Sequence, residues 1–439
     1  MGVTILLGII SVGILIFVHE LGHFLVARAS GIRVEVFSIG WGRGIVSFKW
    51  KDTKIQIGWI PFGGYCKMAG DSPRDDTKGT PDEYYSSSPW RRILVALGGP
   101  TFNYLFAAVL FVFIVIIGYE INTYSNRIIL LRSDEQQFSA DRTPARQAGL
   151  QDGDVIVEIN GEEIRHWDDV TQAIVRNALK PVRIKVLRDG EIFETVAVPE
   201  LDEETGRGLI GIQPWVEPVV GSVIPGEPAA KAGIKQGDRI VSVDGEKIVH
   251  YVGFYEALEG RSGQTVNVEV VRDGMSKTLT LIPQSVDGYV SAGLVFKTLT
   301  YQSTHYPFHE AVGRGLMKSV EGVRDTVRGI YLVVSGKIQA RKAVAGPAKL
   351  IYLSGVIAKE GFVYFLQVMS YISIAFFIMN LIPFPALDGS HIVIALFEIV
   401  ARRKPNLEVI QKIQTFGFLF LIVLLIFITM NDISSFFGR

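Results

Sequence analysis

The sequence predicts a polytopic α-helical membrane protein with four transmembrane helices, two inserted β-rich domains and a membrane-associated β-loop. Long apolar runs lie toward both ends of the 439 residues, the middle is polar and rich in strand-forming residues, and one pattern occurs twice within that middle. About 20 apolar residues are enough to span a bilayer, whereas short apolar runs between turn signals indicate strands.

The predicted transmembrane helices occupy 1–29, 93–119, 361–400 and 413–431. The third range contains a break, because two prolines follow its apolar run. A cleaved signal peptide is the alternative for the first range, since Ala-Arg-Ala at 27–29 resembles a cleavage site. However, no basic residue precedes that run and three ionisable residues interrupt it, which is atypical of a signal peptide.

Basic residues indicate the direction of these helices, because Lys and Arg collect in cytoplasmic loops. They lie in or beside the loop 30–92 and after the third span: Arg28, Arg33, Arg43, Lys49, Lys51, Lys54, Lys67, Arg91, Arg92, Arg402, Arg403 and Lys404. Both loops are therefore expected in the cytoplasm. The long region between the second and third spans, and both termini, are expected on the opposite side.

The charge balance argues against nucleic acid as a partner, because 44 basic residues face 44 acidic ones. Cys66 is the only cysteine, so neither an intramolecular disulfide nor a thiolate metal cluster is available.

The middle of the chain is duplicated. A succession of Pro-Ala, Ala-Gly-aliphatic, Gly-Asp and Asn-Gly or Asp-Gly occurs in 127–215 and again in 216–300, with Gly149 and Gly233 84 residues apart. Each copy indicates a short helix, a tight turn and a strand ending in a hairpin. The pattern resembles tandem PDZ domains of the circularly permuted bacterial kind, which implies binding of extended peptides at a sheet edge. A pair of β-rich spacers without ligand is the alternative.

The range 305–338 is predicted to be an amphipathic helix on the outer membrane surface. Its apolar residues recur at helical spacing: Val312, Leu316, Val320, Val323, Val327, Ile330 and Val334. It either anchors the chain passively or transmits the position of the repeats to the membrane part.

The first span contains His19-Glu20-Leu21-Gly22-His23, an H-E-x-x-H pattern. Residues at i and i+4 share a helix face, so both imidazoles can reach one Zn²⁺ ion. Glu20 lies beside that position, where it can act as a general base on a water molecule. Polar residues satisfied at a helix interface are the alternative, although three ionisable residues in one span are costly without a function.

A third ligand is expected from Asn380-Leu-Ile-Pro-Phe-Pro-Ala-Leu-Asp388-Gly389, which follows the third apolar run. Asp388 is the favoured carboxylate. His391 is the competing ligand, or a partner that orients the metal ligands through a hydrogen bond.

The H-E-x-x-H in the first span and the N-x-x-P-x-P-x-L-D-G element after the third resemble the site-2 protease family of intramembrane metalloproteases, in the branch with tandem PDZ domains. The resemblance covers essentially the whole chain. It implies that His19, His23 and Asp388 bind Zn²⁺ and that Glu20 is the catalytic base. It also implies a bacterial inner-membrane location, a role in stress response, and single-span substrates already trimmed by another protease, such as an anti-sigma factor or a signal peptide remnant.

Other residues are candidates for holding an extended substrate. The segment 54–67 is predicted to form a hairpin near the membrane, and its Gly63, Gly64 and Tyr65 match the family's β-loop. An ordinary turn is the alternative. Asn380 is expected to contact the substrate backbone, and Asn103 either does the same or supports packing.

Two non-enzymatic interpretations remain for comparison. A membrane-tethered PDZ scaffold would be expected to have lost the base or a ligand, and a zinc transporter would be expected to show repeated spans with several intramembrane charges. Neither fits this sequence.

Overall fold

The computed structural model describes residues 2–71, 79–118, 120–131, 142–202, 206–286, 289–302, 306–337 and 346–437. These fall into two compact units: a membrane unit made of Met1–Tyr119 and Thr304–Arg439, and a β-rich unit made of Glu120–Ser303. The predicted ranges 127–215, 216–300 and 305–338 each include residues outside the described ones.

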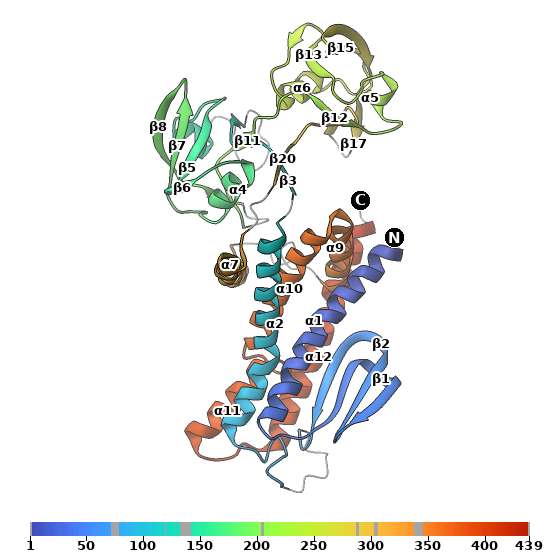
Figure 1. The fold of residues 1–439 in the computed structure, drawn as a ribbon, viewed down its shortest axis with the longest axis vertical. Helices are drawn as coiled ribbons and strands as arrows, with labels where there is room; N and C mark the ends of the chain where they lie inside the picture. Colours follow the sequence, from blue (N-terminus) through green and yellow to red (C-terminus); the bar gives the residue numbers. More distant parts are fainter. Residues whose placement is uncertain are drawn as a thin grey trace. The chain divides into compact units, whose positions relative to one another are not determined.

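Four helices of the described residues are long and apolar enough to cross a membrane. They are α1 (Gly2–Ala29), α2 (Pro89–Ile117), α10 (Phe362–Leu381) and α12 (Leu407–Phe437), as Figure 1 shows. Glycines bring the first two together, since a Cβ atom on Gly22 would lie 2.4 Å from the carbonyl oxygen of Gly98. Small residues allow such close approach between membrane helices.

A further helix, α9 (Pro347–Glu360), packs against α1 and has no counterpart in the sequence prediction. Its 14 residues are too few to span a bilayer. Glycines again set the contact, because a Cβ atom on Gly355 would lie 1.8 Å from the Thr4 carbonyl oxygen.

The loop after α1 folds into a hairpin of β1 (Val34–Trp50) and β2 (Thr53–Met68), which lies beside α1 in Figure 1. The hairpin curls, so that Ser38 pairs with both Gln56 and Tyr65. Segment 64–68 is consequently an edge: within the described residues it pairs with β1 on one side only.

The chain breaks after α10 at 382–387 and resumes as α11 (Asp388–Ala401), whose first residue is the predicted carboxylate ligand. The prolines at 383 and 385 lack the amide hydrogens that a continuing helix would need. The break therefore ends one helix and places Asp388 in the first turn of the next.

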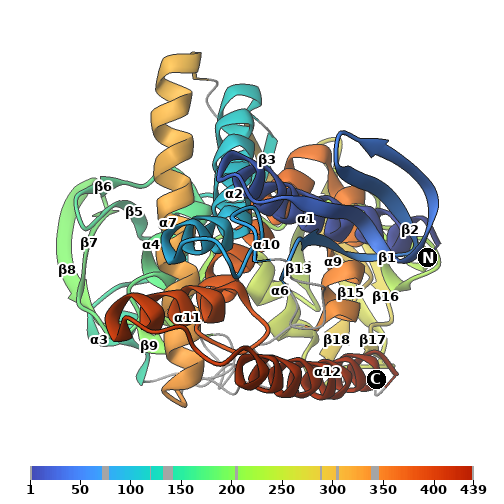
Figure 2. The same cartoon turned by 90° about the horizontal axis from the view of Figure 1, so that it is seen from below.

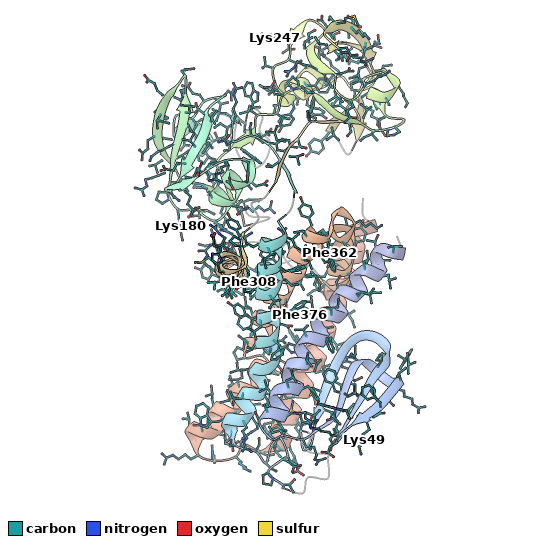
Figure 3. All side chains as sticks on the ribbon, in the orientation of Figure 1. Lys49, Lys180, Lys247, Phe308, Phe362 and Phe376 are labelled. Atoms are coloured by element: carbon teal, nitrogen blue, oxygen red, sulfur yellow. The ribbon has the colours of Figure 1, made fainter. Side chains whose placement is uncertain are left out.

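Helix α7 (Phe308–Val334) packs across α2 and α10 through small residues. It is seen end-on in Figure 1 and along its length in Figure 2. A Cβ atom on Gly315 would lie 2.6 Å from Val112, and Ser319 Oγ donates to Tyr104 Oη at 3.1 Å. Phe308, which begins the helix and is labelled in Figure 3, is exposed, as are Leu316 and Val320 farther along.

The β-rich unit contains the same four-stranded sheet twice. The first is ordered β6 (Glu162–Glu163), β5 (Val155–Ile159), β7 (Val182–Arg188) and β8 (Glu191–Ala197), with α3 (Pro144–Gln147) and α4 (Trp167–Val175). The second is ordered β14 (Glu246–Lys247), β13 (Arg239–Val243), β15 (Val266–Arg272) and β16 (Met275–Leu281), with α5 (Pro228–Lys231) and α6 (Tyr251–Leu258). Each has its own apolar core.

Short two-stranded pairs complete this unit. They are β3 (Glu120–Thr123) with β20 (Leu299–Gln302), β4 (Ile128–Leu130) with β11 (Ile212–Pro214), β9 (Glu200–Leu201) with β10 (Gly208–Leu209), β12 (Val220–Val223) with β19 (Leu294–Phe296), and β17 (Gln284–Val286) with β18 (Tyr289–Ser291).

An arginine–aspartate pair recurs at the 84-residue offset. Arg188 donates to both carboxylate oxygens of Asp154 at 2.8 and 2.7 Å, and Arg272 does the same to Asp238 at 2.7 Å twice. Each arginine also donates to the carbonyl of the preceding Ala-Gly turn. Such bidentate pairs are geometrically specific, so both copies fix their Gly-Asp turn in the same way.

Candidate metal centre and active site

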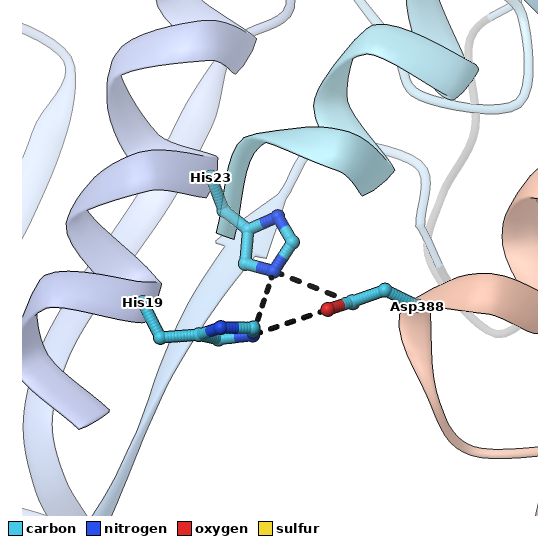
Figure 4. A group of neighbouring side chains, drawn as sticks. All are labelled: His19, His23 and Asp388. Carbon is cyan, nitrogen blue, oxygen red and sulfur yellow. Dashed lines mark hydrogen bonds and ion pairs between the residues drawn. The ribbon is translucent and has the colours of Figure 1, made fainter. Parts of the chain in front are cut away.

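His19, His23 and Asp388 meet in the membrane unit (Figure 4). The two Nε2 atoms are 3.2 Å apart, and Asp388 lies 3.1 Å from Nε2 of His19 and 3.3 Å from Nε2 of His23. Ligands about 2.0 to 2.1 Å from a tetrahedral zinc ion stand about 3.3 Å from one another. The spacing of these atoms therefore suits such an ion.

The hydrogen bond on the far side of His23 fixes its tautomer. Its Nδ1 lies 2.8 Å from the Val95 carbonyl oxygen, which can only accept, so Nδ1 carries the hydrogen and Nε2 presents a lone pair. Asp388 Oδ2 is buried and makes no hydrogen bond. Lone pairs thus face one another across about 3 Å, an arrangement that a bound cation stabilises.

Asn103 orients the other imidazole. Its side chain is fully buried and lies 3.1 Å from Nδ1 of His19, while its Oδ1 has no hydrogen-bond partner. Turning the amide round lets Oδ1 accept a hydrogen bond from Nδ1 of His19. This contact gives Asn103 a third role, orienting His19, beside the two that the sequence predicts, contact with the substrate and support of packing, which stay predictions.

Gly99 makes room for both imidazoles, a feature that sequence reasoning missed. A Cβ atom on Gly99 would lie 2.4 Å from Nε2 of His23 and 2.7 Å from Nε2 of His19. Gly98 and Gly99 both let α2 approach α1, Gly98 against the backbone of Gly22 and Gly99 against the two imidazoles. The signal available in the sequence was the pair of adjacent glycines near the start of the second span.

Glu20 lies between the histidines in sequence and faces the hairpin. A Cβ atom on Gly64 would stand 3.1 Å from Cγ of Glu20, so this glycine lets β2 approach the acid. Gly63 has a φ of 84° and packs against the Trp41 ring. Tyr65 lines the cavity, and its Oη accepts from Gln56 at 3.1 Å. The two glycines thus shape the hairpin and let it approach Glu20, and Tyr65 is the member of this trio that lines the cavity.

One cavity of about 410 Å³ holds these groups. It is lined by Glu20, the three candidate ligands, Tyr65, Cys66, Tyr84, Asn380 and His391, with Phe376 of α10, labelled in Figure 3, at its wall. The rings of His391 and Tyr84 meet edge-on, with their centroids 6.0 Å apart. Among the described residues, no hydrogen bond is recorded between His391 and Asp388. Tyr84 was absent from the sequence-derived candidates.

Two histidines and a glutamate on a helix apolar enough to span a membrane, with a carboxylate from the start of α11 beside them, are the site of a metalloprotease. The chain belongs to peptidase family M50, the site-2 protease family, whose model matches residues 7–424.

Relatives match over nearly the whole chain. The regulator of sigma-E protease RseP of Escherichia coli K12 is 29% identical, with 97% of each chain covered. Protease RseP of Yersinia pestis gives the same figures. A Treponema pallidum protein, provisionally named as a zinc metalloprotease, is 28% identical over 99% of this chain and all of its own.

Two solved structures match a part of the chain. A PDZ domain of Listeria monocytogenes is 22% identical, with 18% of this chain and 84% of that chain covered and a TM-score of 0.17. A Geobacillus thermodenitrificans protein is 26% identical, with 18% and 95% covered and the same TM-score.

Proposed function

We propose that this metalloprotease binds Zn²⁺ through His19, His23 and Asp388 and cleaves peptide bonds inside the membrane. Its substrates are single-span proteins already trimmed by another protease, such as an anti-sigma factor or a signal peptide remnant. The observation that carries the proposal is the shared cavity, because it joins the three ligands and Glu20 among helices apolar enough to span a bilayer.

When bound, zinc supplies Lewis-acid chemistry to a water molecule and to the substrate carbonyl. Glu20 takes a proton from the attacking water on its carboxylate and later gives it to the leaving amide nitrogen. Val95 and Asn103 hold the two imidazoles with Nε2 turned toward the cavity.

The substrate binds as a strand, because a helix hides its amide bonds from attack. The one-sided edge at 64–68 borders the cavity through Tyr65, Cys66 and Met68, so it can pair with an extended segment. Asn380 lines the same cavity, where its amide can bond the substrate backbone.

The β-rich copies act as tandem PDZ domains on the outer side of a bacterial inner membrane, together with both termini, and the site lies toward the cytoplasm. The basic loops support this orientation. The domains exclude untrimmed ectodomains by size or bind newly exposed ends, and α7, with its exposed apolar residues, lies on the lipid surface.

The test is cleavage of a single-span substrate with a truncated ectodomain, using purified full-length protein and an assay of zinc content. The wild type is expected to cut, and Glu20→Gln to bind about one zinc without cutting. Glu408→Gln is the matched control, because Glu408 lies exposed in the first turn of α12 and outside the cavity; wild-type cleavage is expected. Zinc-loaded wild type that cuts none of several such substrates would refute the proposal.

A further inference from the structure

The backbone just before Asp388 takes a conformation that L-residues rarely adopt. Ala386 has a φ of 73°, in the left-handed region. Such a conformation persists only where the surroundings hold it. Pro383 and Pro385 have no amide hydrogen to bond this segment to its neighbours. The segment that aims Asp388 therefore needs a contact from another element.

Gln414 of α12 supplies that contact. Its Oε1 accepts a hydrogen bond from the Ala386 amide, and its Nε2 donates to Ser390 Oγ at 2.8 Å. Ser390 Oγ donates in turn to the Leu387 carbonyl at 2.7 Å. The amide orientation is fixed, because a backbone N–H must meet an oxygen. One side chain thus bonds the residues two before and two after Asp388.

The same face of α12 contacts the rest of the segment. A Cβ atom on Gly417 would lie 2.3 Å from Cβ and 2.7 Å from the carbonyl oxygen of Pro385. The rings of Phe384 and Phe420 are 5.6 Å apart. Only 6% of the most apolar stretch of α12 is buried in the protein. This helix therefore makes few other contacts that could account for a glutamine in a span. A polar group in a membrane helix is costly unless it is paired, and the two bonds of Gln414 meet that condition.

We propose that Gln414 is a positioning residue for Asp388. It holds the left-handed turn at Ala386 and the first turn of α11 in register, so that the carboxylate faces the two imidazoles. The inference rests on the proposed function in one respect, the role of Asp388 as a metal ligand. It adds the last span to the machinery of the site.

The test measures zinc affinity of the full-length protein in detergent by competition with a chelator. Gln414→Met keeps the length of the side chain but removes both bonds, and is expected to weaken zinc binding about 10- to 100-fold. Gln411→Met is the matched control on the same helix, since no hydrogen bond to 382–390 is recorded for Gln411 among the described residues; wild-type affinity is expected. Unfolding temperatures of the metal-free proteins separate this effect from a general loss of stability.

Asp388→Asn in the same titration distinguishes the two proposals. If Asp388→Asn binds zinc like the wild type, the ligand assignment is wrong, and both proposals fall. If Asp388→Asn loses zinc affinity while Gln414→Met does not, the role of Gln414 is refuted and the proposed function stands. The same holds if Gln411→Met loses as much zinc affinity as Gln414→Met. Should Gln414→Met fail to fold, Ser390→Ala removes one of the two bonds from the other side. A smaller loss of affinity is expected, and an unchanged affinity would overturn the inference.

Discussion

Gly99 of α2 lies directly against the imidazole of His23, because a Cβ atom at this position would stand 2.4 Å from Nε2. A methyl group on Gly99 and Nε2 of His23 cannot both keep these positions, and this Nε2 is the atom that lies 3.3 Å from Asp388.

Gly99→Ala is therefore expected to lower zinc affinity at least about 100-fold and to abolish cleavage while helix content stays unchanged. Chelator competition and circular dichroism measure the two effects. Gly13→Ala is the control, because a Cβ atom there meets nothing within 4 Å. Wild-type zinc affinity in Gly99→Ala would contradict the assignment.

Asn103→Leu is expected to weaken zinc binding about 10- to 100-fold, because it removes the partner of His19 Nδ1. Asn103→Asp keeps an acceptor there and is expected to retain more of the affinity. Ser373→Ala loses only a bond to the Asn103 carbonyl, so a small change is expected. If Asn103→Leu and Asn103→Asp lower the zinc affinity equally, the contact with His19 does not act through hydrogen bonding.

Arg92 and Glu398 form an ion pair that joins α2 to α11, with only 3% and 11% of their side chains exposed. Removing one member leaves a buried charge, so Arg92→Met is expected to destabilise the protein by about 3 to 5 kcal/mol. Arg92→Met combined with Glu398→Met is expected to recover most of that loss. Thermal unfolding in detergent measures both, and additive losses would contradict a direct pairing.

The second β-rich copy is expected to lose stability in acid. Burial alone would raise the pKa of Asp238, but hydrogen bonds from Arg272 and the Lys235 amide hold it below its ordinary 3.8. A lowered pKa contributes stability above the ordinary value, and that stability disappears as pH falls through the lowered one.

Asp238→Asn is therefore expected to be less stable at neutral pH and less sensitive to acid. Unfolding of the full-length protein, followed from neutral pH to about pH 3, measures this difference. Glu246→Gln in the same copy is a control with an exposed carboxylate. Equal acid sensitivity in Asp238→Asn and the wild type would show that another group titrates.

Much of the fold follows from local sequence patterns. Apolar runs predict the four candidate membrane helices, and two prolines predict the break before Asp388, because each depends on residues close together in the chain. Helix α9 was missed, since 14 residues with mixed polarity carry no spanning signal. The structure places it against α1 through Gly8 and Gly355, a contact between distant segments that no periodicity encodes.

The candidate site likewise contains residues that local sequence spacing brings together and residues that only helix packing brings together. His19 and His23 lie one turn apart on a single helix, so sequence spacing alone brings them together. The positions of Asn103, Gly99 and Gln414 depend on how α2 and α12 pack, and the sequence offered only residue types for them. The sequence left Asn103 open between contact with the substrate and support of packing, and its contact with His19 was not predicted.

The order of the candidate metal ligands in the chain is also the order in which they are synthesised. His23 and Asp388 are 365 positions apart, so a ribosome delivers two ligands to the bilayer long before the third. A partly made chain holds the glutamate and two imidazoles without the carboxylate that completes the set. Because the proposed ligand set needs Asp388 of α11, a chain that stops before this helix is expected to lack hydrolytic activity.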